Sequence, residues 1–350
     1  MSLLFPSRVI TIDAALRDLA GGPPRARVAA AQALGDVGAP DRARIRPALC
    51  AALDDDLAAV RAEAAASLGE VLAAEVGDGG TADPATVAAL IGRLDDGAGP
   101  VRQAAAIALG TLRDGAGFAP LAAALRDGPA DLRYQAATSL AEIDPVAAFA
   151  PLAAAIDDPD PQVVGAVALG LGASGDARAP ALIARLLEHA DPGARFDAAY
   201  ALAQLDDQRG AGVLAAALTD GARDWDAVVA LERLAGPTAV TALATLIDRR
   251  GSSLEVQARA AGALLAVDAD GAHAARARAH LVAALDARRV TVRGVAIDEL
   301  ARVGGDWALA PLAALAARRR GRELSDAITQ AEAAIRNRTT THPRDPRDPP

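Results

Sequence analysis

The stretch DDGAGPVRQAAAIALGTLRD, residues 95–114, decides the fold class. It opens with turn residues, continues with an apolar residue followed by Arg, and ends in an alanine-rich run closed by Leu and a small residue. Segments 54–73 and 126–144 repeat this order. Alignment on the closing leucine gives matches at Leu34, Leu68, Leu109, Leu140, Leu171, Leu202, Leu231, Leu264 and Leu300. A period near 31 residues indicates stacked structural repeats.

Each repeat has two helical halves. The first half opens with a proline, which suits the first helical position; these prolines are Pro47, Pro120, Pro151, Pro180, Pro237 and Pro311. The second half follows a turn in which Asp160-Pro161 and Asp191-Pro192 are expected to cap the helix. Apolar residues then recur at helical spacing, and no strand-length alternation occurs.

The sequence therefore predicts an all-α protein, a right-handed α-solenoid of about nine to ten two-helix repeats. We expect a lead-in over residues 1–12, the solenoid over 13–337 and a disordered Pro/Arg/Asp tail over 338–350. Insertions near 72–86 and 268–276 are expected to lengthen loops between helices.

The period and the apolar–Arg–x–x–Ala–Ala pattern resemble the HEAT repeat family, in particular its short bacterial form, the phycobilin-lyase-type repeat. The recurring arginine stands at Arg27, Arg61, Arg102, Arg133, Arg195 and Arg293, and is replaced by Val164, Asp224 and Gln257. The resemblance implies that this arginine pairs with aspartates in neighbouring turns. A row of anion-binding arginines is the alternative. The resemblance is informative for fold and much less so for function.

Composition narrows the function classes. Hydrophobic residues make up 52% of the 350 residues and aromatic residues 2%, so the core is aliphatic. The single cysteine, Cys50, excludes an internal disulfide and a cysteine zinc cluster. None of the four histidines lies in an H-E-x-x-H pattern, and no phosphate-binding loop is present. We therefore expect no metal, no cofactor and no enzymatic activity.

Charge is distributed unevenly along the chain. All 36 basic residues are arginine, and the net charge is −9, which disfavours nucleic acid as a partner. Residues 1–275 hold 22 Arg and 36 acids, a charge of −14, whereas residues 276–350 hold 14 Arg and 9 acids, a charge of +5. The basic end is densest at Arg318, Arg319, Arg320 and Arg322. It either complements a helix C-terminus or docks on an anionic surface, including the acidic body of a second copy.

Aromatic residues are rare enough to be informative. When the apolar residue before the recurring arginine is position 1 of the second helix, Tyr134, Phe196 and Trp225 all fall at position 3. Tyr200 falls at position 7. Positions 1, 5, 8, 9 and 12 carry the core, so positions 3 and 7 are predicted to face outward on the concave side. The predicted partner surface is Gln103, Ile107, Tyr134, Phe196, Tyr200 and Trp225, with Arg133 and Arg195 near its rim. A shift of one residue would instead place these rings in the core.

These observations favour a cytoplasmic, non-enzymatic scaffold that binds a peptide or a partner helix of another protein on its concave face. The start of the sequence, MSLLFPSRVITID, lacks the pattern of a secretory signal, and no apolar run is long enough to span a membrane. The alternative function is a phycobilin-lyase-like chaperone, lyase or other small-molecule-binding enzyme that uses the groove. The third hypothesis is binding of nucleic acid or another anionic surface through the C-terminal arginines.

Overall fold

The computed structural model describes residues 11–219 and 221–341. Within these ranges the chain forms twenty α-helices and no strand, so the predicted all-α class of two-helix repeats is confirmed. The chain divides into two compact units, residues 1–201 and residues 202–350. Each unit is described by itself below.

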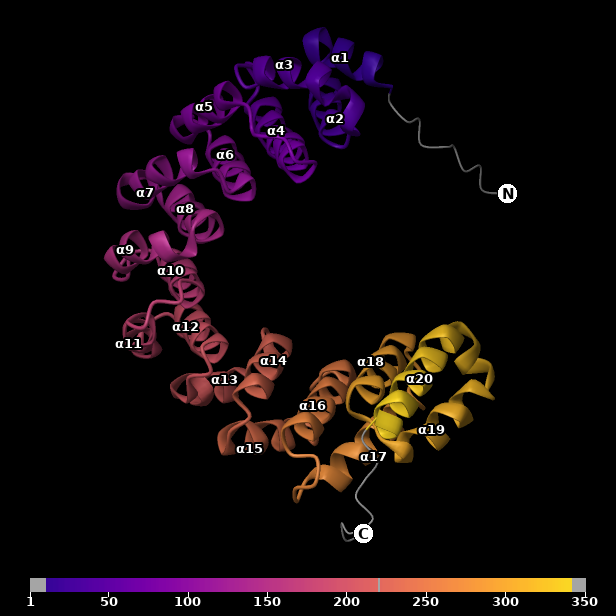
Figure 1. Ribbon diagram of the computed structural model, residues 1–350. Helices are drawn as coiled ribbons and strands as arrows, with labels where there is room; N and C mark the ends of the chain where they lie inside the picture. Colours follow the sequence, from indigo (N-terminus) through magenta and orange to yellow (C-terminus); the bar gives the residue numbers. More distant parts are fainter. Residues whose placement is uncertain (1–10, 220, 342–350) are drawn as a thin grey trace. The chain divides into compact units, whose positions relative to one another are not determined.

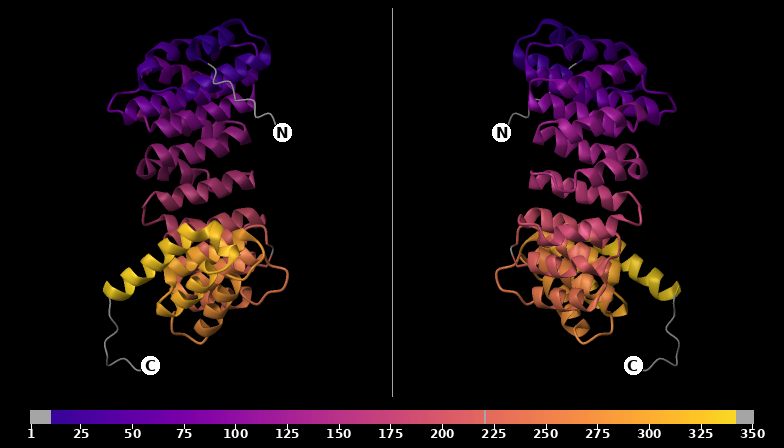
Figure 2. Two further views of the ribbon diagram at one scale, coloured as in Figure 1. Left: turned by 90° about the vertical axis from the view of Figure 1, so that its right-hand side faces the viewer. Right: turned by 90° about the vertical axis from the view of Figure 1, so that its left-hand side faces the viewer.

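The first unit consists of six helix pairs, of which the last helix, α12, has its final three residues in the second unit. Its helices are α1 (Ile12–Gly21), α2 (Pro24–Gly35), α3 (Arg42–Ala52), α4 (Ala58–Gly77), α5 (Pro84–Gly92), α6 (Gly99–Leu112), α7 (Phe118–Asp127), α8 (Ala130–Ile143), α9 (Pro145–Ala154), α10 (Pro161–Ala173), α11 (Ala179–Arg185) and α12 (Pro192–Gln204). Even-numbered helices form the inner layer of this unit and odd-numbered helices the outer layer (Figure 1). The inner helices stack side by side in the same orientation (Figure 2).

The second unit contains four more pairs. Its helices are α13 (Ala211–Ala217), α14 (Asp224–Leu234), α15 (Pro237–Leu246), α16 (Leu254–Val267), α17 (Ala274–Ala284), α18 (Val290–Val303), α19 (Asp306–Ala316) and α20 (Ser325–Thr341). The helix α14 packs on α16, α16 on α18 and α18 on α20, so the same two-layer order is kept.

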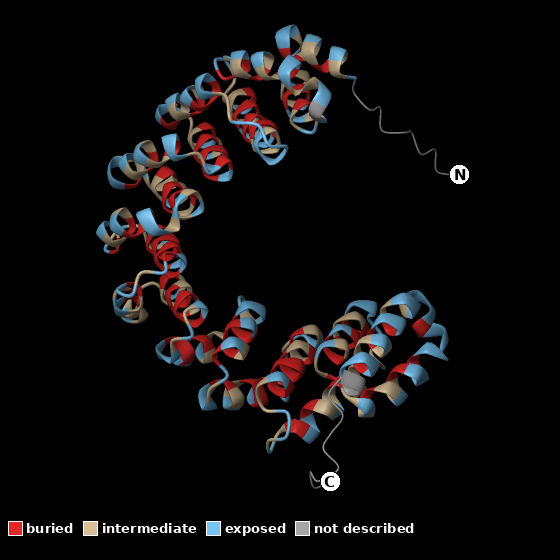
Figure 3. Cartoon of the chain, viewed as in Figure 1, coloured by how far each residue is buried: buried red, intermediate tan, exposed pale blue. Residues whose placement is uncertain are grey.

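The core of each unit lies between its two layers (Figure 3). The repeat leucines are buried at its centre; Leu34, Leu68, Leu109, Leu140 and Leu171 have no measurable exposure. Small residues let the inner helices approach closely. A Cβ added to Gly69 on α4 would lie 2.7 Å from the Cβ of Ala108 on α6. The second helices therefore pack backbone to backbone, as the alanine-rich composition predicts.

Local capping chemistry sets several helix starts. The Asp160 carboxylate accepts a hydrogen bond from the Gln162 amide at 2.9 Å, and Asp191 accepts one from the Ala194 amide at the same distance. Pro161 and Pro192 follow as first helical residues. Both predicted caps are thus confirmed.

Two local predictions were wrong. Pro47, Pro151 and Pro311 lie inside α3, α9 and α19, and Pro120 is the third residue of α7, so none of the four takes the first helical position. In α9 the start is set earlier, because Asp144 caps the Ala147 amide and Pro145 takes the first position. The insertion near 72–86 is also not all loop, since α4 continues to Gly77. Its residues 72–77 favour helix because they are mostly alanine and other helix formers.

The ends of the predicted solenoid stay predictions. Thr11 caps α1, and α20 continues to Thr341, four residues into the segment predicted as a tail. Residues 1–10 and 342–350 lie outside the described residues. No helix in the described ranges combines the length and apolar character needed to cross a membrane.

Candidate functional site

The recurring arginine forms a clamp between successive repeats of the first unit. Arg61 on α4 donates to both carboxylate oxygens of Asp96, at 2.8 and 2.9 Å, and to the Asp55 carbonyl at 2.8 Å. Arg133 on α8 makes the same pattern with Asp158 and the Gly128 carbonyl. Arg27–Asp56 and Arg102–Asp131 are further ion pairs of this kind. We call each such pair an arginine–aspartate clamp.

Two of the clamp aspartates also order their own turns. Asp96 accepts a hydrogen bond from the Ala98 amide and Asp158 one from the Asp160 amide, both at 2.9 Å. The hydrogen bonds from Arg61 hold the pKa of Asp96 below its ordinary value. Burial opposes this effect at Asp158, but the bonds from Arg133 still leave its pKa lowered. The family-derived expectation of structural pairing therefore describes this arginine better than an anion-binding row.

This result changes the interpretation of the predicted rim. The Arg133 guanidinium donates hydrogen bonds to Asp158 and to the Gly128 carbonyl. Arg195 donates to the carbonyls of His189 and Ala190, at 2.7 and 2.9 Å. Both side chains therefore form hydrogen bonds to turns of the solenoid. Arg133 is neutralised by Asp158, whereas the bonds of Arg195 go to neutral carbonyls and leave its positive charge in place.

The apolar part of the predicted surface is exposed where the register places it. Ile107 on α6 is 47% exposed, Tyr134 on α8 is 44% exposed and Leu169 on α10 is 37% exposed. Gln103 is exposed one turn before Ile107. The side chains at positions 1, 5, 8 and 9 of these three helices are buried. Three successive inner helices thus present a large apolar side chain outward. We call positions 3, 4, 7 and 11 of the inner helices of the first unit the inner face.

Phe196 departs from the prediction. It occupies position 3 of α12 but is only 6% exposed, so it is not a free anchor. Its ring stacks on Tyr200, one turn later, with centroids 6.3 Å apart and planes 22° apart. α12 also lies close to α10 here, because a Cβ on Gly165 would come within 2.3 Å of the Asp197 carboxylate. Tyr200 remains half-buried at the surface.

Trp225 belongs to the second unit. It lies in the first turn of α14 and is exposed, as is Val229 one turn later. These two side chains form a small apolar surface on α14. The part of the predicted partner surface that one unit carries is therefore Gln103, Ile107, Tyr134 and Tyr200, joined by Leu169.

A partly buried network of four charges links three helices of the second unit. Arg259 on α16 binds Glu232 on α14 at 2.5 Å and lies 3.5 Å from Glu299 on α18. Arg302 binds Glu299 at 2.6 Å and also Glu232. Burial raises the pKa of Glu299 against the pull of both arginines. The network balances two positive with two negative charges, and the sequence analysis missed it.

The basic end is partly neutralised by its neighbours. Arg318 forms an ion pair with Asp286, and Arg320 donates to the Asp286 carbonyl at 3.4 Å. Arg319 and Arg322 are exposed in the short helix Arg319–Leu324. Docking of an anionic surface at this end stays a prediction.

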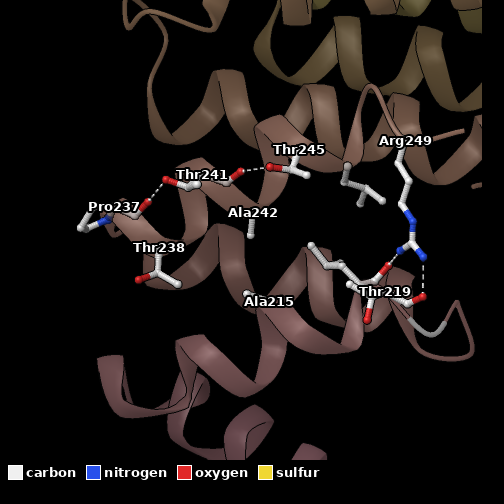
Figure 4. A pocket seen from close by; sticks show the side chains of 10 residues that line it. Ala215, Thr219, Pro237, Thr238, Thr241, Ala242, Thr245 and Arg249 are labelled. Carbon is white, nitrogen blue, oxygen red and sulfur yellow. Dashed lines mark hydrogen bonds between the residues drawn. The ribbon is translucent and has the colours of Figure 1, made fainter.

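A cavity of about 530 Å³ lies in the second unit, between α13 and α15 (Figure 4). Its walls are alanine, leucine and threonine side chains. The hydroxyls of Thr241 and Thr245 donate to helix carbonyls four residues earlier, at 2.9 and 2.8 Å. Arg249 donates to the carbonyls of Leu218 and Thr219. The polar groups that Figure 4 joins by dashed lines are thus engaged within the fold.

Few residues are arranged for covalent chemistry. His280 Nε2 lies 3.1 Å from an oxygen of Asp248, which Arg276 also binds at 2.9 Å. The Cys50 sulfur lies 3.6 Å from the Thr86 hydroxyl and is half-buried. In the described ranges, no three His, Cys, Asp or Glu side chains are grouped to hold a metal ion.

The geometry above defines an α-solenoid repeat protein with interlocked turns. Residues 13–110 and 118–185 match the family model of HEAT repeats, and residues 101–127 match that of the PBS lyase HEAT-like repeat. The first unit is therefore built of HEAT repeats, and the resemblance drawn from the sequence is confirmed. No curated protein sequence matches the chain significantly.

Several solved structures are similar. The complex of CpcE and CpcF of phycocyanin lyase from Nostoc sp. PCC7120 contains a chain with 25% identity and a TM-score of 0.46, with 67% of this chain and 92% of that chain covered. A structure of Kap95p with RanGDP contains a chain with 12% identity and a TM-score of 0.51, with 94% of this chain and 51% of that chain covered. At this identity the likeness to the latter concerns the fold alone.

Proposed function

We propose that the protein is a non-enzymatic scaffold that binds a peptide or a helix of another protein on the inner face of its first unit. The observation that carries the proposal is the row of Ile107, Tyr134 and Leu169, exposed on three successive inner helices. Exposed apolar side chains that follow one another in this way are typical of partner surfaces. Tyrosine suits such a surface because it buries a large area at little cost in rotamer entropy.

The fold supports the proposal by separating stability from binding. Core positions hold the layers together, and the arginine–aspartate clamps hold the turns. Ile107, Tyr134 and Leu169 stand at neither the core positions nor the clamps, and their side chains are 37–47% exposed. The cytoplasmic location predicted from the sequence remains part of this proposal.

Site-specific photocrosslinking tests this function. A photoreactive phenylalanine derivative, p-benzoylphenylalanine, would replace Tyr134 in one variant and Val146 in another. Val146 is a matched control because it is 74% exposed on the outer helix α9. We expect a protein crosslinked in cells from position 134 and none from position 146. Equal crosslinking from both positions, or none from 134, would contradict the inner face as the binding surface.

A phycobilin-lyase-like chaperone or enzyme is the second candidate. The match of residues 101–127 to the PBS lyase HEAT-like repeat favours it. Titration of the protein with a free bilin distinguishes it from the scaffold, because binding shifts the bilin absorption band. A saturable shift that is lost on replacing inner-face residues would favour the bilin-binding function.

A further inference from the structure

Three glutamates on the inner face have no cationic partner among the residues that the structure describes. Elsewhere in the first unit, Arg46 binds Glu75 and Arg133 binds Asp158. Glu63, Glu70 and Glu142, by contrast, form no ion pair within the described residues. Two of them, Glu70 and Glu142, are exposed.

Two of these carboxylates lie against the preceding inner helix, and that of Glu142 lies beside the apolar row. A Cβ on Gly110 of α6 would lie 2.6 Å from Oε2 of Glu142, which places that carboxylate one turn from Ile107. A Cβ on Gly35 of α2 would likewise lie 2.7 Å from Oε2 of Glu70. Glycine at these sites leaves room for the acidic side chain to lie flat. The negative charge is thus adjacent to exposed apolar surface.

The sign of the inner face is uniform. Across positions 3, 4, 7 and 11 of the inner helices, from α2 to α12, the sequence has no arginine, and its acids are Asp36, Glu63, Glu70, Glu142 and Asp197. Burial raises the pKa of Glu63, and the charge of Glu70 raises it further. Both effects disfavour the ionised form of the Glu63 carboxyl in the free protein.

We infer that the inner face of the first unit binds a cationic amphipathic segment of another protein. Its apolar side chains would pack on Ile107, Tyr134 and Leu169, and its Arg or Lys side chains would lie beside Glu63, Glu70 and Glu142. This inference rests on the proposed function and names its partner class. A neutral segment would desolvate these carboxylates without pairing them, and an acidic one would be repelled.

Selection from a random peptide library tests the inference without knowledge of the natural partner. Displayed peptides of about 18 residues, about 27 Å long as a helix, would be selected on the full chain. A parallel selection would use the variant Ile107→Ser/Tyr134→Ser/Leu169→Ser, whose helicity is checked by circular dichroism. Peptides enriched on the wild type alone depend on the inner face.

Charge variants then test the partner class. Glu63→Gln/Glu70→Gln/Glu142→Gln removes three inner-face charges. The control Asp18→Asn/Asp95→Asn/Glu188→Gln removes three charges from the outer layer that form no ion pair in the described residues. We expect the enriched peptides to be cationic, with apolar residues at helical spacing. Their affinity should fall about tenfold in the inner-face variant, fall much less in the control, and weaken with salt.

The alternative outcomes are distinguishable. If the enriched peptides depend on the apolar row but are neutral or acidic and bind the glutamine variant equally, the charge inference is wrong and the proposed function stands. If no peptide depends on the apolar row, both are wrong. If sedimentation shows that the chain dimerises and loses this on replacing either the inner-face glutamates or Arg319 and Arg322, the occupant is a second copy and not a separate partner.

Discussion

Arg133 and Asp158 are joined by two parallel hydrogen bonds of 2.8 Å each, from Nε to Oδ2 and from Nη2 to Oδ1. The pair connects α8 to the turn before α10 and is mostly buried, with the Asp158 side chain 6% exposed. Because the aspartate also caps its own turn, one contact fixes both the turn and the helix of the preceding repeat. The predictions below begin with this pair.

Arg133→Ala is expected to lower the free energy of unfolding by about 3 kcal/mol, because it leaves a buried carboxylate without its cation. Arg133→Lys should also destabilise, since lysine cannot form the two parallel bonds. Urea unfolding measures both. The control is Arg185→Ala, which breaks an exposed pair with Asp157 and should cost at most about 0.5 kcal/mol. Equal losses at positions 133 and 185 would mean that the clamp does not stabilise the fold.

Stability should fall in acid because the clamp aspartates must be protonated. The folded-state pKa of Asp96 and Asp158 is lowered from the ordinary value of 3.8. Their contribution is therefore present above the unfolded-state pKa and is lost as pH falls through the folded-state value. The midpoint temperature of thermal unfolding should therefore fall steeply as the pH is lowered below the unfolded-state pKa of these aspartates. The variant Asp96→Asn/Asp158→Asn should be less stable at neutral pH, and its unfolding temperature should depend less on pH in acid. An unchanged dependence on pH would mean that other groups cause the loss of stability in acid.

Gly69→Ala should destabilise the first unit by about 2 kcal/mol, since the added methyl meets the Ala108 backbone as well as its Cβ. Gly294→Ala is the matched control. Gly294 also lies inside a helix, α18, but a Cβ there meets nothing within 4 Å. Its replacement should stabilise by up to about 1 kcal/mol through helix propensity. Opposite signs in urea unfolding are the expected result, and a gain at both positions would show that the inner helices have room to spare.

Phe196→Ala and Tyr134→Ala should separate core from surface. Loss of the buried Phe196 ring is expected to cost about 3 kcal/mol. Tyr134→Ala, at a 44% exposed position, should cost less than about 1 kcal/mol. Denaturant unfolding of the two variants measures the difference. A larger loss at Tyr134 would place that ring in the core and remove the central residue of the proposed binding surface.

Features that depend on local pattern were predictable from the sequence. Repeat leucines, Asp-Pro caps and the inner-face positions of Ile107 and Tyr134 follow from helical periodicity and from hydrogen bonds within a few residues. The burial of Phe196 was not predictable in this way, because it depends on how closely α12 approaches α10. Proline position was also misleading, since Asp144 and Pro145 start α9 before Pro151 is reached.

Long-range electrostatics were harder still. Glu232, Arg259, Glu299 and Arg302 come from three repeats, and no short motif marks them. The available signal was that Arg259 occupies position 4, where the repeats of the first unit carry Ala, Glu, Gln or Asp. Similarly, the unpaired state of Glu142 becomes visible only when the partners of every nearby arginine are known.

The clamps of the first unit act in series, which has a mechanical consequence. The arginines of the clamps lie on α2, α4, α6 and α8. In α10 the buried Val164 takes the place of the arginine. Tension along this unit would pass through each clamp in turn and then reach a joint where the exposed Arg185–Asp157 pair stands in place of a buried clamp. Extension under force would therefore begin between α10 and α12, and the contact between these two repeats would separate before the clamped ones.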